Sequence, residues 1–220
     1  MIPLVETGLF RNISQCNIEK MMKCTGAVTR GYKAGAYIFR EEDIPRYLYL
    51  ILEGEVSVVK DFASGRQDIL YVAEAGEVFG EDFFGPEQKP YWFDAVANKD
   101  TILLLLPWKF FFDFCSNACD HHQQIIRNML ELMAVKNLNM TKKAHILSSI
   151  TLREKISVWL LENMKGGQMD TRMNREQMAA YLGVTRPSLS RELMKMQKEG
   201  IICINRNQIQ IIDENKLYEK

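Results

Sequence analysis

The sequence predicts an α+β protein in three parts: an N-terminal antiparallel β-roll of the jelly-roll type, a long helix, and a C-terminal winged helix-turn-helix. Three observations lead to this prediction. Short apolar runs separated by glycine or charged turns recur over residues 31–107, a spacing typical of antiparallel sandwiches and rolls. A helical pattern without glycine or proline follows over residues 117–144. Two short helices joined by a tight turn are then indicated between residues 173 and 200.

The expected strands of the roll are short and are bounded by turn residues. They share an apolar or alternating pattern and comprise residues 37–39, 47–52, 56–59, 69–72, 78–79, 95–97 and 102–106. Before the roll, residues 1–25 predict one or two short helices with Ser14 or Asn17 as the N-cap. After it, residues 108–115 predict a short aromatic helix.

The long helical segment carries two neighbouring apolar stripes. Their members are Ala118, Ile125, Met129, Leu132 and Asn139 in one stripe, and Ile126, Leu130, Met133 and Met140 in the other. Two stripes suit a helix that packs on its own domain with one face and on a partner helix with the other, which predicts a homodimer. The alternative is a helix buried wholly within one chain. We expect a sensor roll at 1–116, a dimerisation helix at 117–146 and a C-terminal domain at 147–220, with a hinge at 145–150.

The helix-turn-helix prediction rests on capping and turn residues. Asn174 and Gln177 fit a capping box at the start of the first helix. Gly183 ends that helix because the turn requires φ > 0. Thr185 caps the second helix, which we expect at Arg186–Lys198, and Pro187 lies in its first turn, where a missing N–H is tolerated. The buried face of this helix consists of apolar residues at helical spacing, namely Leu189, Leu193 and Met196.

The outer face of the second helix carries hydroxyls and cations. An α-helix fits the major groove of DNA, where Arg bonds guanine O6 and N7 and hydroxyls bond bases or phosphates. We therefore predict that this helix reads double-stranded DNA. The residues expected to contact DNA are Thr185, Arg186, Ser188, Ser190, Arg191 and Lys195. An ordinary αα-hairpin with a solvated basic face is the alternative.

Elements on both sides complete the C-terminal domain. A helix is expected at Thr151–Met164, with Thr151 as its cap. Residues 201–204 and 208–212 alternate around a polar turn, which predicts a β-hairpin, or wing. Arg206 at the tip of this hairpin is expected to contact a phosphate, although a solvated turn arginine fits the sequence equally well.

Composition agrees with this reading. The 220-residue chain has no net charge, but residues 151–220 contain 12 Lys and Arg against 9 Asp and Glu, a basic excess that agrees with DNA contact. Five cysteines, an odd number, argue against a disulfide scaffold. No apolar run is long enough to span a bilayer and the N-terminus has no signal-peptide pattern, so a cytoplasmic location without a membrane partner is expected. No nucleophile, base or phosphate-loop constellation is visible, so an enzyme is not expected.

In this order, the roll, the long helix and the winged helix-turn-helix resemble the cyclic-AMP receptor protein/FNR family of bacterial transcription regulators. The most specific segments are residues 35–56, 76–81 and 182–191. The resemblance implies a dimer on an inverted-repeat operator, base contacts from Arg186 and Arg191, an effector-sensing roll, and RNA polymerase as a partner. Pro187 stands where many members carry Glu, which accepts a hydrogen bond from cytosine N4. The operator is therefore expected to differ from that of the cyclic-AMP receptor.

The effector pocket departs from the family pattern. Gly80 and Glu81 match the start of the segment that holds the nucleotide, but Tyr91 and Trp92 stand where nucleotide-binding members have Arg-Ser. Without that Arg a cyclic phosphate lacks its bidentate partner, so we do not expect cyclic AMP to bind in the usual way. The neighbouring aromatic residues suit either a pocket for an apolar or planar ligand or plain core packing, and comprise Phe79, Phe83, Phe84 and Phe93.

Other assignments concern the long helix and the segment before it. Met129 and Met133 are assigned to the effector pocket, so effector binding is expected to repack the helix. Cys115 and Cys119 lie one helical turn apart, a spacing that suits a metal site or a thiol switch, although small core residues fit equally well. A ligand-binding module with a vestigial DNA domain is a further alternative. We assign no cofactor, and the small-molecule effector is unknown.

Overall fold

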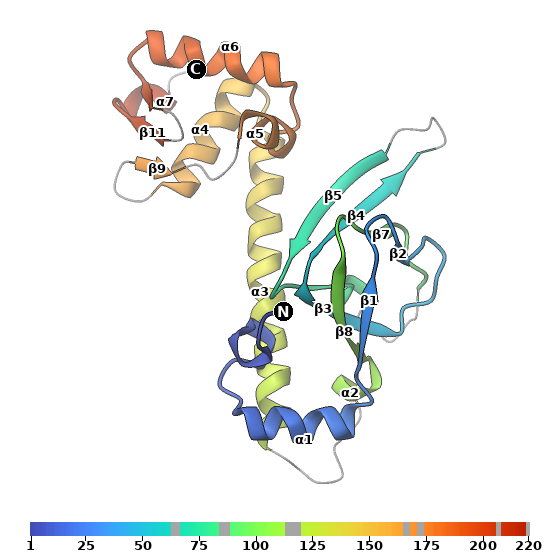
Figure 1. Ribbon diagram of the computed structural model, residues 1–220. Coiled ribbons are helices and arrows are strands. Elements are labelled where there is room, and N and C mark those ends of the chain that lie inside the picture. The colour runs from blue at the N-terminus through green and yellow to red at the C-terminus, as the bar shows by residue number, and fades with distance from the viewer. Residues whose placement is uncertain are drawn as a thin grey trace. The chain divides into compact units, whose positions relative to one another are not determined.

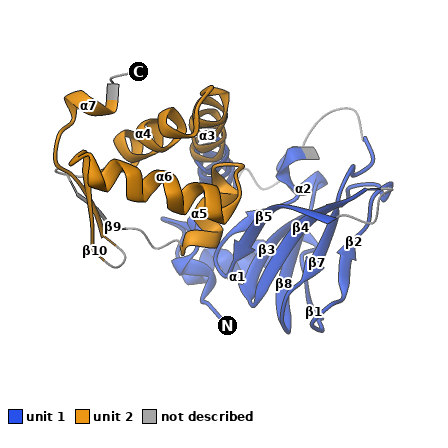
Figure 2. Ribbon diagram, turned by 90° about the horizontal axis from the view of Figure 1, so that it is seen from above, with its two compact units in different colours: residues 1–134 blue, residues 135–220 orange. Residues whose placement is uncertain are grey.

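The computed structural model describes residues 1–62, 67–83, 89–112, 120–164, 168–170, 174–205 and 208–218. The chain forms two compact units, Met1–Ala134 and Val135–Lys220, which Figure 2 shows in different colours. The first unit contains two four-stranded sheets, and the second contains helices and a three-stranded sheet. The predicted α+β class is confirmed. The division at residues 116 and 146 stays a prediction.

The N-terminal unit is built around a β-roll (Figure 1). Its strands are β1 (Val28–Tyr32), β2 (Tyr37–Phe39), β3 (Tyr47–Glu53), β4 (Glu55–Asp61), β5 (Gln67–Glu74), β6 (Val78–Phe79), β7 (Asp94–Ala97) and β8 (Thr101–Pro107). The order is β1-β8-β3-β6 in one sheet and β2-β7-β4-β5 in the other, with all neighbours antiparallel. Every run that we predicted as a strand lies in one of these elements, so the antiparallel roll is confirmed.

The edge strand β1 was not predicted from the sequence. Its residues, VTRGY, do not alternate between apolar and polar, and none of them is buried. They nevertheless pair along the whole strand with β8, from Val28 opposite Leu105 to Tyr32 opposite Thr101. The pairing partner, which is distant in sequence, makes this segment a strand, and a local pattern cannot reveal it.

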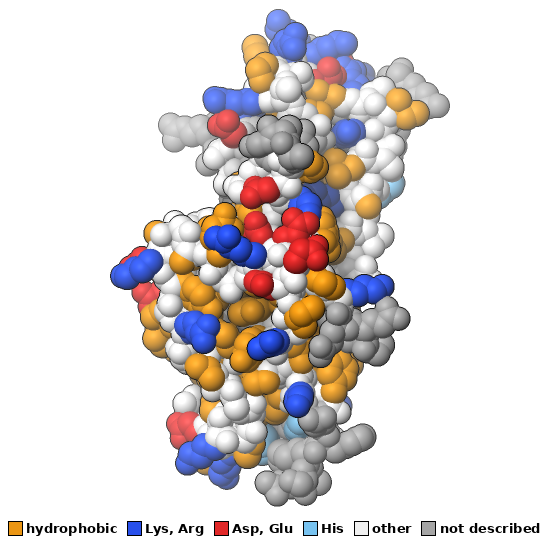
Figure 3. Space-filling model, turned by 90° about the vertical axis from the view of Figure 1, so that its right-hand side faces the viewer, with side chains coloured by type: hydrophobic (Ala, Val, Ile, Leu, Met, Phe, Trp, Pro, Cys, Tyr) orange, Lys and Arg blue, Asp and Glu red, His pale blue; other side chains and the backbone are white. Residues whose placement is uncertain are grey.

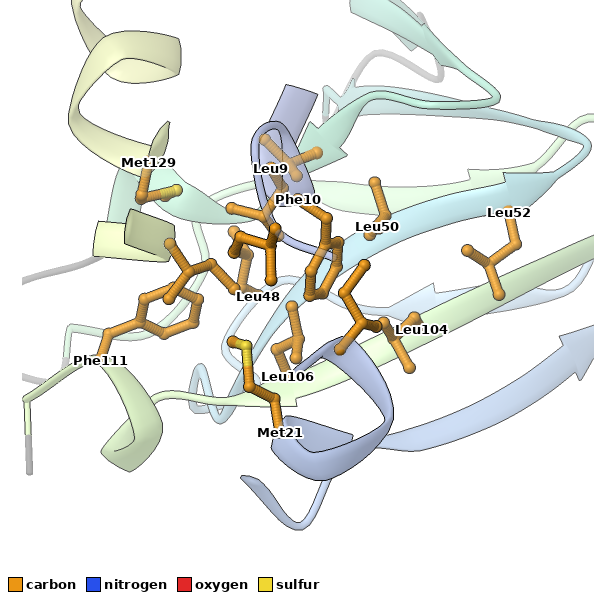
Figure 4. Packing of buried hydrophobic residues seen from close by; sticks show 14 residues of the cluster. Leu9, Phe10, Met21, Leu48, Leu50, Leu52, Leu104, Leu106, Phe111 and Met129 are labelled. Carbon is orange, nitrogen blue, oxygen red and sulfur yellow. The ribbon is translucent and has the colours of Figure 1, made fainter. Parts of the chain in front are cut away.

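Short helices precede and follow the strands. They are η1 (Leu4–Glu6), η2 (Gly8–Phe10) and α1 (Gln15–Thr25) before β1, η3 (Glu81–Phe83) after β6, and α2 (Lys109–Phe112) after β8. Ser14, one of the two predicted caps, caps α1 by accepting a hydrogen bond from the Asn17 N–H at 3.4 Å. A cluster of buried apolar residues from η2, α1, β3, β8 and α2 joins these helices to the sheet (Figure 4).

The long helix α3 (Asp120–Ser148) has 29 residues. One polar side chain fixes its first half to the N-terminal segment. The Asn128 amide is almost fully buried and donates to the backbone oxygens of Leu9 and Arg11, at 2.9 and 2.7 Å. This face of α3 therefore packs on its own unit, as one of the two predicted stripes requires.

The predicted hinge at residues 145–150 stays a prediction, and only its last two residues are non-helical. Residues 145–148 form the last turn of α3, and Ile146 is fully buried in the core of the C-terminal unit. No glycine or proline interrupts this turn, so the helix continues to Ser148, three residues before Thr151, the cap of the next helix. Only residues 149–151 are non-helical between the two helices.

The rest of the C-terminal unit is a helical domain with a small sheet. Its elements are α4 (Leu152–Asn163), β9 (Gln168–Asp170), α5 (Arg175–Tyr181), α6 (Arg186–Lys198), β10 (Ile202–Asn205), β11 (Gln208–Ile211) and α7 (Asn215–Tyr218). The sheet order is β10-β11-β9, so the predicted hairpin is confirmed and β9, which was not predicted, adds a third strand. Within the described part of the chain, no helix is long and apolar enough to cross a membrane.

Candidate nucleic-acid interface and effector site

The first helix of the helix-turn-helix, α5, begins with the predicted capping box. The Asn174 side chain accepts hydrogen bonds from the N–H groups of Glu176 and Gln177, both at 2.9 Å. Gln177 reciprocates, because its Oε1 accepts from the Asn174 N–H at 2.9 Å. After α5, Gly183 has φ of +66°, the left-handed conformation that glycine adopts without penalty. The turn between α5 and α6 is therefore fixed by its sequence.

The start of α6 is also as predicted. Thr185 is the N-cap, and its Oγ1 accepts from the Ser188 N–H at 3.3 Å. The two hydroxyl oxygens of Thr185 and Ser188 are 2.9 Å apart, so both hydroxyls are engaged in capping. Leu189, Leu193 and Met196 are buried against the rest of the domain, which fixes the face that α6 turns outward.

Cations dominate the outward face of α6. The Arg186 side chain is 63% exposed, and its Nη1 lies 3.9 Å from Glu176 Oε2 on α5, a long contact at the surface that is worth little. Arg191 and Lys195 are exposed as well, whereas Ser188 and Ser190 are half-buried. The structure thus presents the three predicted cations on one helix, and places the hydroxyls at its margin.

Two further residues of this face were missing from our prediction. Met194 is 60% exposed, and Lys198 is exposed, three and seven positions after Arg191. The helical period places side chains at these spacings on the same face, and this signal was available in the sequence. Arg206 and Asn207 lie outside the described residues, so the predicted phosphate contact from the wing has no structural description.

Arg153 on α4 holds the recognition helix α6 at two points. Its Nε donates to Glu192 Oε1 at 2.8 Å, and its Nη1 donates to Glu199 Oε2 at 2.7 Å. These hydrogen bonds raise the pKa of Arg153 and lower that of Glu199. The arginine side chain is only 26% exposed, so it joins the first turn of α4 to the middle and the end of α6. We did not predict this role, although two glutamates seven positions apart mark one helix face.

On the sensor side, Gly80 and Glu81 follow the short strand β6. Gly80 has φ of +84°, and a Cβ there would lie 3.1 Å from Tyr49 Cδ2, so the position suits glycine alone. Glu81 is 4% exposed. After burial, the negative charge of Glu81 is the next largest cause of the raised pKa of Tyr71. The structure therefore places the predicted Glu inside the roll beside a buried phenol.

Tyr91 and Trp92 face opposite ways. Tyr91 is 2% exposed and stacks on Phe39 with ring centroids 3.7 Å apart, whereas Trp92 is 54% exposed. Lys60 on β4 donates to the Trp92 backbone oxygen at 2.7 Å and also pairs with Glu41. Because Lys60 is 32 positions before Trp92, a search along the sequence near Trp92 did not reveal this neighbouring cation.

The predicted effector-pocket residues do not meet in one place. Tyr91 lies in the aromatic cluster between the two sheets with Phe79 and Phe93. Met129 is buried in the other cluster of this unit, against which Met133 packs, and Figure 4 shows Met129 beside the N-terminal residues and Phe111. The hydrogen bonds of Asn128 turn this part of α3 toward η2, which explains the separation. Phe79, Phe93 and Tyr91 are packed in this cluster, and Tyr91 also lines a cavity beside it.

The metal and thiol alternative concerns a segment without a structural description. Cys115 and Cys119 lie outside the described residues. Among the residues that are described, no group of His, Cys, Asp and Glu is arranged to hold a metal ion, and Cys16, Cys24 and Cys203 are exposed and free.

Comparison with known proteins identifies both units. Residues 29–118 match the cyclic nucleotide-binding domain and residues 154–220 match the Crp-like helix-turn-helix domain. The chain belongs to the Crp/Fnr family of transcription regulators. Members of this family are DNA-binding proteins with an effector-binding domain, typically dimeric, and they are not enzymes. The expected family and the absence of enzymatic activity are therefore confirmed.

Individual relatives of this Crp/Fnr regulator are distant. It is 28% identical over 191 residues to the nitrogen fixation regulation protein FixK of Bradyrhizobium diazoefficiens, covering 83% of this chain and 77% of the relative. It is 26% identical to the cyclic AMP receptor protein of Thermus thermophilus, covering 86% of both chains. The structure of FixK2 from Bradyrhizobium japonicum matches with a TM-score of 0.52 at 25% identity, over 87% of this chain and 96% of that chain.

Proposed function

We propose that this Crp/Fnr regulator is a homodimer that binds an inverted-repeat operator through α6 and responds to a small molecule bound in its N-terminal unit. The observation that carries the proposal is the outward face of α6. Capping and burial fix that helix in place, and Arg186, Arg191 and Lys195 are left exposed on it. The site of action would be the cytoplasm, with DNA and RNA polymerase as macromolecular partners.

The operator should differ from that of the cyclic-AMP receptor. Arg186 and Arg191 suit bidentate contacts with guanine, while Pro187 offers no side-chain acceptor to cytosine N4. Exposed Met194 adds an apolar contact of the kind that suits a thymine methyl group. A two-fold dimer presents its recognition helices to half-sites roughly 34 Å apart.

Replacing Arg186 with Ala should weaken binding to the cognate operator by about 1–3 kcal/mol and relax the preference at one base pair. The measurement is fluorescence anisotropy with an operator selected from random duplexes and with each of its single-base variants. Lys33→Ala is the control, because Lys33 pairs with Asp100 in the N-terminal unit and should leave the base preferences intact. Unchanged affinity and preference in Arg186→Ala would remove this residue from the readout.

The homodimer is supported by the second apolar stripe of α3. Ile126, Leu130, Met133 and Met140 follow the alternating spacing of a coiled-coil seam, and two of them, Ile126 and Met133, also pack against the core of their own unit. Leu130 and Met140 are 62% and 63% exposed, which is unusual for large apolar side chains on a helix that buries its opposite face. A partner helix would cover them, and a two-fold operator requires a dimer in any case.

Replacing Leu130 with Glu should dissociate the dimer, because two like charges would face each other across the seam at a cost of several kcal/mol. We expect the dimer Kd to rise at least about 100-fold, measured by analytical ultracentrifugation. Val135→Glu is a matched control, since Val135 is 58% exposed but lies on another side of α3. A dimer that survives in Leu130→Glu and dissociates in Val135→Glu would show that the face of α3 with Val135, and not the stripe with Leu130, forms the interface.

The sensing mechanism we propose is a population shift. An effector would favour one packing of α3 around Met129–Met140, and the non-helical residues 149–151 would absorb the reorientation of the DNA-binding domain. Usual cyclic AMP binding is disfavoured by the buried, uncharged Tyr91 at the position of the phosphate-binding Arg. A thermal-shift screen with cyclic nucleotides, metabolites and metals tests this, because a ligand at 100 times its Kd adds about 2.7 kcal/mol.

A further inference from the structure

A cavity of about 240 Å³ lies at the edge of the roll, and its lining includes Tyr47 and Tyr49, the residues nearest to Gly80. The strands β1 and β2 are the edge strands of the two sheets, and β6 and β5 form the opposite edges. Residues of β1, β2, β3 and the connection between β2 and β3 line the cavity. Figure 3 views the molecule from the side on which β1 and β2 lie in Figure 1, and cationic and apolar side chains stand next to each other there.

Hydrogen-bond donors without protein partners converge on this cavity. Arg30 on β1 and Arg46 before β3 both line it, and neither guanidinium forms an ion pair with another described residue. The same holds for the hydroxyls of Tyr32 and Tyr47, which form no hydrogen bond within the described part of the chain. Among the described residues that line the cavity, Asp43 is the one with an acidic side chain. Two guanidinium groups against one carboxylate leave an excess of positive charge in the lining, and the Asp43 Oδ2 accepts the Arg40 backbone N–H at 2.8 Å.

The segment that contains Asp43 is joined to the roll by backbone hydrogen bonds to Tyr91. The Tyr91 N–H donates to the backbone oxygen of Asp43 at 3.0 Å, and the Glu42 N–H donates to the backbone oxygen of Tyr91 at 2.9 Å. Glu42 has φ of +70°, a conformation that is uncommon for residues other than glycine. Such residues cluster at ligand sites, where the surrounding structure holds them.

Aromatic rings form the inner surface of the cavity. Phe39 stacks on Tyr91, and Tyr47 meets Tyr49 edge-on with centroids 6.3 Å apart. Burial raises the pKa of Tyr49 to about 12, so its hydroxyl keeps its proton at neutral pH. An aromatic surface with peripheral guanidinium groups suits a flat ring that carries an anionic substituent, because rings pack on rings and guanidinium pairs with carboxylate in a bidentate fashion.

We infer that this cavity binds a small one-ring aromatic carboxylate, with its ring against the tyrosines and its carboxylate between Arg30 and Arg46. The volume lies below that of drug-sized ligand pockets, which favours a single ring over a nucleotide. The cavity shares Tyr91 with the site implied by the cyclic nucleotide-binding domain, so this inference names a ligand class for the effector site of the proposed function and rests on that function. Binding requires neither DNA nor a dimer.

Isothermal titration calorimetry of the full chain with benzoate tests the assignment. We expect saturable binding that Arg46→Gln or Arg30→Gln weakens at least about tenfold each. Benzamide, which has the same size but no charge, should bind at least about tenfold more weakly than benzoate. Arg40→Gln is the matched control, because this exposed arginine lies over the Tyr37 ring at 4.2 Å and not in the cavity lining.

Three results would overturn the inference. One is the absence of saturable heat at about 10 mM benzoate, tenfold above a millimolar Kd. Another is equal affinity for benzoate and benzamide. The last is unchanged binding in the Arg30→Gln/Arg46→Gln double variant, with thermal unfolding like that of the wild type. None of these results bears on operator binding, so the proposed function is tested independently.

Discussion

Replacing Arg153 with Met is expected to destabilise the C-terminal unit by about 2–3 kcal/mol and to weaken operator binding. The substitution leaves the carboxylates of Glu192 and Glu199 without their shared cation. Breaking a buried pair costs roughly 3–5 kcal/mol, and the figure is reduced here because Arg153 is 26% exposed. Operator affinity should fall as well, because uncompensated carboxylates on α6 and at its C-cap would repel the DNA phosphates.

Urea unfolding measures the first effect. The fluorescence of Trp159, which is 1% exposed in the core of the C-terminal unit, is followed in a background with Trp92 and Trp108 replaced by Phe. The triple variant Arg153→Met/Glu192→Gln/Glu199→Gln should recover most of the stability and the operator affinity, because no uncompensated charge remains. If the triple variant were as unstable in urea as Arg153→Met alone, Arg153 would act by packing and not by holding the two carboxylates.

Replacing Gly54 with Ala should destabilise the roll by about 2–6 kcal/mol, combining roughly 1–3 kcal/mol of backbone strain with roughly 1–3 kcal/mol of overpacking. Gly54 joins β3 to β4 with φ of +104°, and a Cβ there would lie 2.2 Å from Thr101 Oγ1 and 2.6 Å from Thr101 Cα. The hairpin and β8 would have to separate. Thermal unfolding of the full chain measures the effect.

Gly35→Ala separates strain from collision. Gly35 has φ of +79°, but nothing lies within 4 Å of a Cβ built there. It should therefore cost only about 1–2 kcal/mol, the penalty for a left-handed conformation. Equal losses in the two variants would mean that the contact with Thr101 relaxes and that strain alone matters at Gly54.

Local signals predicted the recognition helix well. The bounds Arg186–Lys198, the Thr185 cap and the Asn174 capping box all appear as expected, because capping and glycine turns act within a few residues. The strands of the roll were visible for the same reason, as short apolar runs between turns. The edge strand β1 was not, because its pairing with β8 is its only reason to be extended.

The side-chain contacts of the N-terminal unit could not be predicted from the sequence. Met129 and Met133 fall on a helix face that also suits a pocket, and only the hydrogen bonds of Asn128 to the N-terminal segment reveal that this face packs on η2. Lys60 is distant in sequence from Trp92, so no local pattern predicts its contact with the Trp92 backbone. Arg30 and Arg46 also come from separate segments, so no local pattern predicts that both line one cavity. Arg153 was overlooked for the same reason.

The most direct test of the central claim is selection of binding sites from random duplex DNA with the full chain, repeated across salt concentrations. We predict enrichment of an inverted repeat whose half-sites lie about one helical turn apart, with affinity that falls steeply as salt rises. The enrichment should disappear in the Arg186→Ala/Arg191→Ala variant while the dimer persists. Enrichment of no sequence, or of the same inverted repeat by that variant, would contradict DNA reading by α6.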